Sequence, residues 1–257
     1  MIGIMDWGIG GLTVYQAMRN RGLTTDVLYF SDSGTTPYGK LSKVSLRERF
    51  TTIAEFFGQR GVAHVLVGCH SASSALEPDP ETGLESFGVV SLESIIPAAV
   101  RTSCRSKSKS LGVIGGERTI QSGVYAGALQ ALGKQLSFCA AQPLSAFVEA
   151  GELDSPAVET EVRRVLGILG PIDALLIACT HYPALTPIFS KVSPTLELLD
   201  PGDEMTASLH EEGESRFEFF TTGNRNASAH AARLAFGIEI DFPADFLEPG
   251  FFLRLNP

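Results

Sequence analysis

Two cysteines, Cys69 and Cys179, have the sequence surroundings of reactive thiols. Each follows an apolar run and precedes small polar residues and a histidine, as Cys-His-Ser-Ala-Ser at 69–73 and Cys-Thr-His-Tyr-Pro at 179–183. Such a turn leads into a helix, whose positive N-terminal end lowers the pKa of a thiol. The neighbouring histidine can add to this effect or carry a proton. We therefore treat both as candidate reactive groups, the alternative being two buried, inert side chains.

The same turns offer helix caps and two kinds of chemistry. Ser71, Ser73 and Thr180 are available as cap residues at the expected helix starts. Two thiols that face each other across a cleft suit the inversion of a carbon centre, because one takes a proton while the other gives one. A single nucleophilic cysteine with one histidine as its base would instead suit acyl transfer. The paired arrangement favours proton transfer at carbon.

A glycine-rich turn follows the first apolar run, with Asp6 before it and glycines at 8, 10 and 11. Its backbone N–H groups could approach an anion. The glycine spacing does not fit a dinucleotide-binding fingerprint, and Asp32 leads into a polar loop rather than a ribose-binding position. We expect Asp6 to hold an ammonium group or orient a base, the alternative being a helix N-cap.

Short apolar runs alternate with longer amphipathic stretches along the chain. This alternation predicts an α/β protein with parallel sheets, whose functional residues collect at the C-terminal ends of the strands. The expected strands are 2–5, 26–30, 64–67, 88–90, 111–114, 136–139, 174–178, 197–199 and 217–221. The expected helices are 12–21, 42–60, 121–132, 157–170 and 227–236.

A weak internal repeat indicates two similar halves. A Gly-to-Cys spacing of 66 residues (3 to 69) is followed by one of 67 (112 to 179), and both cysteines end a similar apolar run. We expect two α/β domains related by pseudo-twofold symmetry, with the active site in the cleft between them. The first would comprise 1–97 plus about 210–257, and the second 98–209. The polar stretch 101–110 would be a helix end or the hinge, and 200–214 the return crossing.

Composition narrows the class of protein further. The chain has 257 residues, 44% of them hydrophobic, and a net charge of −9, which argues against disorder and nucleic-acid binding. No apolar run is long enough to span a membrane, and no signal peptide is recognisable, so we expect a cytoplasmic protein with reduced thiols. Cys104 and Cys139 are expected to be packing residues. His64, His210 and His230 have no metal-ligand spacing.

Taken together, these motifs resemble those of the glutamate racemase branch of the cofactor-independent aspartate/glutamate racemase superfamily. The matches cover essentially the whole chain, and the two cysteine motifs in this order are specific. The matching segments are Asp6–Gly11, Pro37–Gly39, Cys69–Ser73, Gly112–Tyr125, Pro143–Gly151, Cys179–Pro183 and Phe219–Gly237.

The resemblance implies a fold, a reaction and roles for residues. It implies an isomerase, with no pyridoxal phosphate, no other cofactor and no metal, that supplies a D-amino acid for peptidoglycan and forms a homodimer. Cys69 and Cys179 would be the two bases, assisted by Asp6 and by His181, with Glu149 supporting His181. The residues expected to contact the amino-acid substrate are Trp7, Pro37, Tyr38, Gly39, His70, Ser71, Thr119 and Thr180.

The residues that depart from the family pattern stand at positions concerned with substrate recognition. Trp7 replaces a serine, His70 an asparagine, Ser71 a threonine and Gly116 a threonine. These changes leave open glutamate, a related amino acid such as aspartate, or a non-catalytic relative that binds a ligand or protein and whose pocket Trp7 fills. A decarboxylase or another isomerase that uses one cysteine is a third possibility. His70 could also favour the thiolate of its neighbouring cysteine.

Overall fold

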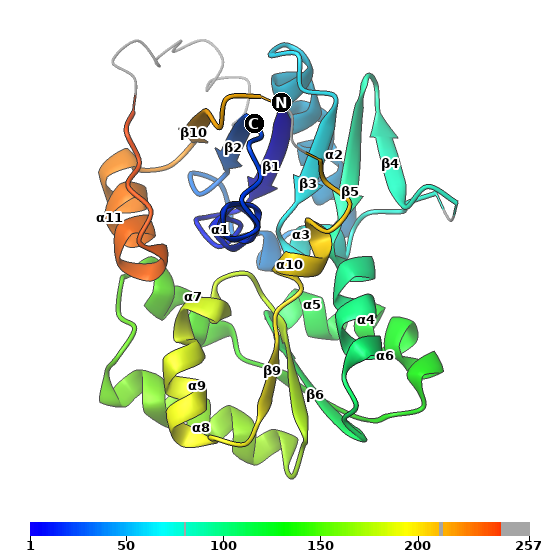
Figure 1. Ribbon diagram of the computed structural model, residues 1–257, viewed down its shortest axis with the longest axis vertical. Coiled ribbons are helices and arrows are strands. Elements are labelled where there is room, and N and C mark those ends of the chain that lie inside the picture. The colour runs from blue at the N-terminus through cyan, green and yellow to red at the C-terminus, as the bar shows by residue number, and fades with distance from the viewer. Residues whose placement is uncertain (80, 211–212, 243–257) are drawn as a thin grey trace.

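The computed structural model describes residues 1–79, 81–210 and 213–242, whose strands form two sheets (Figure 1). The six-stranded sheet has the order β10-β2-β1-β3-β5-β4, which is Phe217–Thr221, Val27–Ser31, Ile2–Asp6, His64–Val67, Val90–Ser94 and Leu84–Phe87. The four-stranded sheet has the order β7-β6-β8-β9, which is Gln135–Ala140, Ser110–Gly115, Ala174–Ala178 and Glu197–Leu199. The strand pairs are parallel apart from β4 with β5, which confirms the predicted α/β class.

The internal repeat is visible in the strand order. Strands β2-β1-β3-β5 of the first sheet have the same sequence of neighbours as β7-β6-β8-β9 of the second. The repeat has a glycine in the first strand of each half, Gly3 in β1 and Gly112 in β6, and close packing explains both. A Cβ on Gly3 would lie 2.7 Å from the Val65 side chain, and one on Gly112 would lie 2.6 Å from the Ile172 side chain. Each glycine therefore lets a neighbouring side chain pack directly against its strand.

Helices surround both sheets, and the two halves lie one above the other along the longest axis (Figure 1). One apolar cluster contains residues of both sheets, among them Ile4 of β1 and Ile177 of β8, so the halves share a core. The α-helices are α1 Leu12–Asn20, α2 Lys43–Gly58, α3 His70–Ser73, α4 Ile95–Arg105, α5 Glu117–Gln121, α6 Val124–Leu129, α7 Gln142–Glu149, α8 Pro156–Leu169, α9 Thr186–Val192, α10 Gly202–Met205 and α11 Arg225–Phe236. The 3-10 helices are η1 Tyr38–Lys40, η2 Gln130–Leu132 and η3 Tyr182–Leu185.

Two predicted elements are wrong, and a glycine explains each. Of the strand expected at 88–90, residues 88 and 89 form the turn of the β4–β5 hairpin, because Gly88 has a φ of 65°, and Val90 is the first residue of β5. The helix expected at 121–132 is divided into the end of α5, then α6, then η2. Gly123, with a φ of 71°, separates α5 from α6. A left-handed residue ends a helix, so a single continuous one cannot form here.

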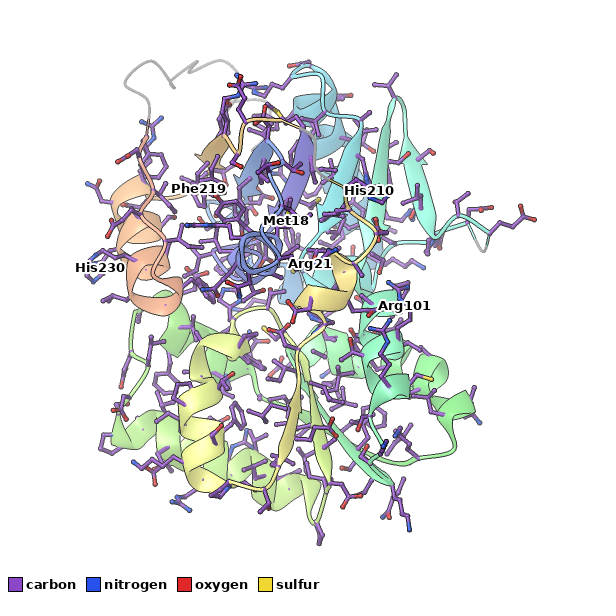
Figure 2. The ribbon with its side chains drawn as sticks, in the orientation of Figure 1. Met18, Arg21, Arg101, His210, Phe219 and His230 are labelled. Carbon is purple, nitrogen blue, oxygen red and sulfur yellow. The ribbon has the colours of Figure 1, made fainter. Side chains whose placement is uncertain are left out.

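The chain leaves the first sheet through α4 and returns to it through α10. The stretch 101–110 is the end of α4 and the entry to β6, so the helix-end interpretation is correct for its first part. Buried Glu204 of α10 accepts hydrogen bonds from Arg101, at 2.6 Å, and from Arg105. On the other side, Arg21 at the end of α1 donates to the carbonyl group of Thr206 (Figure 2). These bonds fix the return crossing, whereas the exact division into domains stays a prediction.

Within the described ranges, none of the helices is both long and apolar enough to cross a membrane.

Candidate active site

Asp6 is the last residue of β1 and connects the two halves. Its Oδ2 accepts a hydrogen bond from the Thr180 hydroxyl, which follows β8, at 3.0 Å and from the Gly11 N–H at 2.6 Å. Its Oδ1 accepts from the Trp7 N–H at 2.6 Å. Burial raises the pKa of the Asp6 carboxyl, although the His181 imidazole and the surrounding donors oppose this. The N-cap of α1 is Gly11, so the alternative interpretation of Asp6 as that cap is wrong.

The glycine-rich turn after Asp6 lets these groups meet. A Cβ on Gly10 would lie 2.6 Å from His181 Nδ1, 2.7 Å from Thr180 Oγ1 and 2.8 Å from Asp6 Oδ2, closer than a Cβ approaches other atoms. The carbonyl of Gly8 accepts a hydrogen bond from the buried Tyr29 hydroxyl at 2.8 Å. The turn therefore needs glycine for close approach rather than for binding phosphate.

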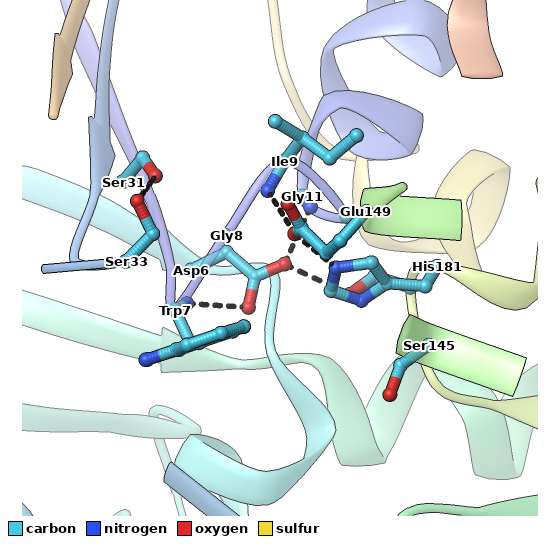
Figure 3. A network of polar contacts seen from close by, with 12 residues as sticks. Asp6, Trp7, Gly8, Ile9, Gly11, Ser31, Ser33, Ser145, Glu149 and His181 are labelled. Carbon is cyan, nitrogen blue, oxygen red and sulfur yellow. Dashed lines mark hydrogen bonds and ion pairs between the residues drawn. The ribbon is translucent and has the colours of Figure 1, made fainter. Parts of the chain in front are cut away.

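Cys179 lies at the start of a hydrogen-bonded chain that continues through His181 to Glu149, the last two of which are drawn in Figure 3. Its Sγ is 3.8 Å from His181 Nδ1, and His181 Nε2 is 2.6 Å from Glu149 Oε1. The same Glu149 oxygen accepts from the Ile9 N–H of the first half at 3.1 Å. Burial acts to lower the pKa of His181, but its bonds to Cys179 and Glu149 raise it well above the usual value. Burial acts to raise the pKa of Glu149, yet the imidazole lowers it, so the pair is ionic.

Cys69 follows β3 and is 7% exposed. Burial, followed by the charge and hydrogen bond of Asp6, raises the pKa of the Cys69 thiol well above its usual value. The expected lowering is therefore wrong for this cysteine, because α3 has only four residues and desolvation outweighs its dipole. The expected caps are also wrong: Ser73 donates to the Val67 carbonyl, and Thr180 donates to Asp6.

His70 is 2% exposed and reaches into the second half, where its Nδ1 lies 2.5 Å from the Tyr125 hydroxyl. Its Nε2 has no hydrogen-bond partner among the described residues. Burial lowers the pKa of His70 to about 3, so the ring is neutral near pH 7. The expectation that His70 favours a thiolate by its charge is therefore wrong.

Other predicted substrate residues lie where the halves meet. The hydroxyls of Ser71 and Thr119 are 3.1 Å apart, one from each half. Tyr38 is buried and donates its hydroxyl to Asp32 at 2.7 Å, so that hydroxyl is not available as a donor to a ligand. Tyr38 and Gly39 belong to the 3-10 helix η1, and Pro37 is its N-cap.

Trp7 is held against the first half. Its indole Nε1 donates to the Thr35 carbonyl at 3.1 Å, and the ring packs on the apolar cluster that includes Tyr38 and Cys69.

Three residues at this site were not singled out from the sequence. Tyr29 holds the glycine turn, Tyr125 binds His70, and Gln142 accepts a hydrogen bond from the Glu117 N–H at 3.1 Å. The sequence offers their polar groups in apolar surroundings as a signal, and Tyr125 also ends a segment that matches the family, but their partners are 21 to 55 residues away.

No group of three or more metal-binding side chains lies together in the described part of the chain. The four cysteines are unpaired, with Cys104 exposed and Cys139 buried.

The fold is one that amino-acid racemases share. An aspartate racemase from Picrophilus torridus superposes with a TM-score of 0.53 at 14% identity, over 80% of this chain and 93% of that one. Glutamate racemase from Thermus thermophilus, solved with beta-chloro-D-alanine, gives a TM-score of 0.79 at 30% identity, over 93% and 94%. Glutamate racemase from Aquifex pyrophilus is 35% identical over 229 residues, which are 86% of this chain and 88% of that protein. No protein-family model matches the chain.

This chain belongs to the glutamate racemase family, within the aspartate/glutamate racemase superfamily. The resemblance inferred from the cysteine motifs is thereby confirmed.

Proposed function

We propose that this protein interconverts L- and D-glutamate with Cys69 and Cys179, one removing the α-proton from one face of the carbon while the other gives a proton to the opposite face. The observation that carries the proposal is that each thiol has its own acid–base partner. Cys69 lies beside Asp6, and Cys179 lies 3.8 Å from His181. The two cysteines follow equivalent strands, β3 and β8, of the two halves. Family membership supplies the substrate and the class of reaction.

In this mechanism one sulfur is a base while the other is an acid. The thiolate takes the α-proton from one face of the substrate, and the electron pair left on carbon takes the proton of the opposite thiol. The second sulfur is then the thiolate, ready for the reverse reaction. The His181 imidazolium stabilises negative charge on Cys179, whereas the raised pKa of Cys69 keeps that sulfur protonated.

The substrate carboxylates need donors, because the carbanion-like transition state has no cofactor to accept its electrons. We assign this role to the hydroxyls of Ser71 and Thr119 and to the backbone N–H groups of 38–39 and of Thr180, whose hydroxyl donates to Asp6. Pro37, Trp7 and His70 complete the walls of the cleft within the same proposal.

We also propose a cellular compartment for the reaction. Four unpaired cysteines suit a reducing compartment, so we place the reaction in the cytoplasm, where it would supply D-glutamate for peptidoglycan. We also propose that the protein acts as a homodimer, which size-exclusion chromatography with light scattering would test.

The proposal is tested by following the α-proton of a panel of L- and D-amino acids in D₂O by NMR. We expect exchange with inversion for glutamate. Cys69→Ser and Cys179→Ser should each lower racemisation roughly 100- to 10,000-fold, since each removes a general acid–base group. Cys104→Ser, at an exposed cysteine, is the matched control. Inversion of aspartate alone would reassign the substrate, release of CO₂ would indicate a decarboxylase, and silence across the panel would indicate a binding protein.

A further inference from the structure

Helix α5, which carries Thr119, takes its cap from a distant residue. It has five residues, and its N-cap, Gly116, has no side chain to accept the free N–H groups of the first turn. The Glu117 N–H instead donates to Oε1 of Gln142 at 3.1 Å. The backbone of Gly116 has φ −65° and ψ 160°, which is the conformation in which serine and threonine cap helices. The cap of α5 therefore comes from Gln142 of another helix, although the backbone at Gly116 has the conformation that would suit a capping side chain at that residue.

Gln142 lies between loops of both halves. A Cβ on Gly116 would lie 3.0 Å from Gln142 Oε1, and a Cβ on Gly39 of the other half would lie 3.6 Å from it. The amide group is held in turn by Ser145, whose hydroxyl accepts from Nε2 at 3.3 Å and donates to the Gln142 carbonyl at 2.9 Å. Gln142 therefore has a fixed orientation next to the Pro37–Gly39 loop.

Gln142 also begins the helix that Glu149 ends. Helix α7 spans Gln142–Glu149, so its first residue holds α5 and its last residue holds His181 and the Ile9 N–H. Its inner face is anchored by Leu144 and Val148, both fully buried. One helix thus sets the place of groups in both halves of the chain.

We propose that Gln142 is a positioning residue for the reaction: by capping α5 it fixes Thr119 opposite Ser71, where the substrate binds. This inference rests on the proposed function for its kinetic part. Thr119 is 1% exposed, and its hydroxyl is 3.1 Å from that of Ser71. Without the cap the first turn of α5 frays, and the distance between the two hydroxyls is no longer fixed. Substrate binding weakens more than the chemical step, since the two thiols are untouched.

The test uses Gln142→Ala and a rescue variant. We expect the KM of Gln142→Ala for glutamate to rise roughly 3- to 10-fold with a smaller change in kcat, as for loss of a helix cap and of uniform binding. Hydrogen exchange of the amides at 117–121 should become faster. In Gln142→Ala/Gly116→Ser the new hydroxyl can cap α5 locally, and both quantities should return toward wild-type values. Gln130→Ala, at an exposed glutamine of the same half, is the control.

The outcomes separate this inference from the proposed function. Exchange at 117–121 reports on the cap even in a protein that does not racemise glutamate. Unchanged exchange and KM in Gln142→Ala would overturn the positioning role. A raised KM that Gly116→Ser does not rescue would also overturn it, because it would indicate direct contact between Gln142 and the substrate. If Gln142→Ala does not fold, Gln142→Glu keeps an acceptor oxygen and must show wild-type exchange at 117–121.

Discussion

Replacing Glu149 by glutamine tests the electrostatic support of Cys179. The substitution keeps an oxygen that can accept from His181 and Ile9 but removes the negative charge, 2.6 Å from the imidazole. A hydrogen bond to a charged group contributes about 1.5–3 kcal/mol, and the two side chains are only 6% and 24% exposed, so solvent screens the pair weakly. If the support is lost in the transition state, kcat/KM falls roughly 10- to 150-fold.

The change in the pKa of His181 determines in which direction the pH profile of Glu149→Gln moves. In the wild type the pKa of His181 is raised, so the imidazolium persists to higher pH than for a free histidine. Glu149→Gln lowers that pKa, and the alkaline limb of the kcat/KM profile should move to lower pH. The stability contributed by the pair also depends on pH. The part that comes from the raised pKa of His181 is present below the unfolded pKa of histidine and is lost as pH rises through the folded pKa, whereas the part that comes from the lowered pKa of Glu149 is lost as pH falls through its folded pKa.

The assay is racemisation of glutamate in both directions between pH 6 and pH 10, followed by circular dichroism of the substrate. Glu152→Gln, at an exposed glutamate three residues further along, is the matched control and should behave as the wild type. A Glu149→Gln enzyme with kcat/KM within twofold of the wild type and an unmoved alkaline limb would refute the reasoning.

Three further changes have definite outcomes. Gly10→Ala places a methyl group within 2.8 Å of three polar atoms of the site, and overpacking by about 1–3 kcal/mol should appear as a roughly 5- to 150-fold loss of kcat/KM in a folded protein, checked by circular dichroism. Tyr125→Phe leaves His70 Nδ1 buried without its partner and should lower the free energy of unfolding by about 1–3 kcal/mol in urea titrations; an unchanged midpoint would contradict this contact. Arg216 lowers the pKa of Asp26 to about 2, so Asp26→Asn should destabilise the protein at pH 7. Unfolding curves at successive pH values should show that difference shrinking below about pH 5 and vanishing only below about pH 2, because a lowered folded pKa contributes stability that is lost as pH falls through it.

Much of the frame could be predicted from the sequence because buried parallel strands are continuous apolar runs. The runs that end at Cys69 and Cys179 became β3 and β8 with the predicted bounds, and the repeat became a shared strand order. Where a glycine adopts a positive φ, as at Gly88 and Gly123, the apolar pattern continues through a turn, and the pattern alone predicts the wrong element.

The electrostatics of the site could not be predicted in the same way. The charge of a histidine depends on which group faces it, and that partner is 32 residues from His181 and 55 from His70. The two histidines look alike in sequence, each within two residues of a cysteine. Contact with a carboxylate makes one cationic, whereas burial against a phenol makes the other neutral.

Cys69 and Cys179 follow equivalent strands but have different neighbours, and this difference affects turnover. The two directions of racemisation begin from chemically different sides, because one sulfur has a cation beside it and the other a carboxylate. The maximal rates from the L- and D-enantiomers should therefore differ. The equilibrium constant between enantiomers is unity, so the Haldane relation requires the two Michaelis constants to differ by the same ratio. The enzyme thus produces an equal mixture of the two enantiomers, although it is saturated at different concentrations of each.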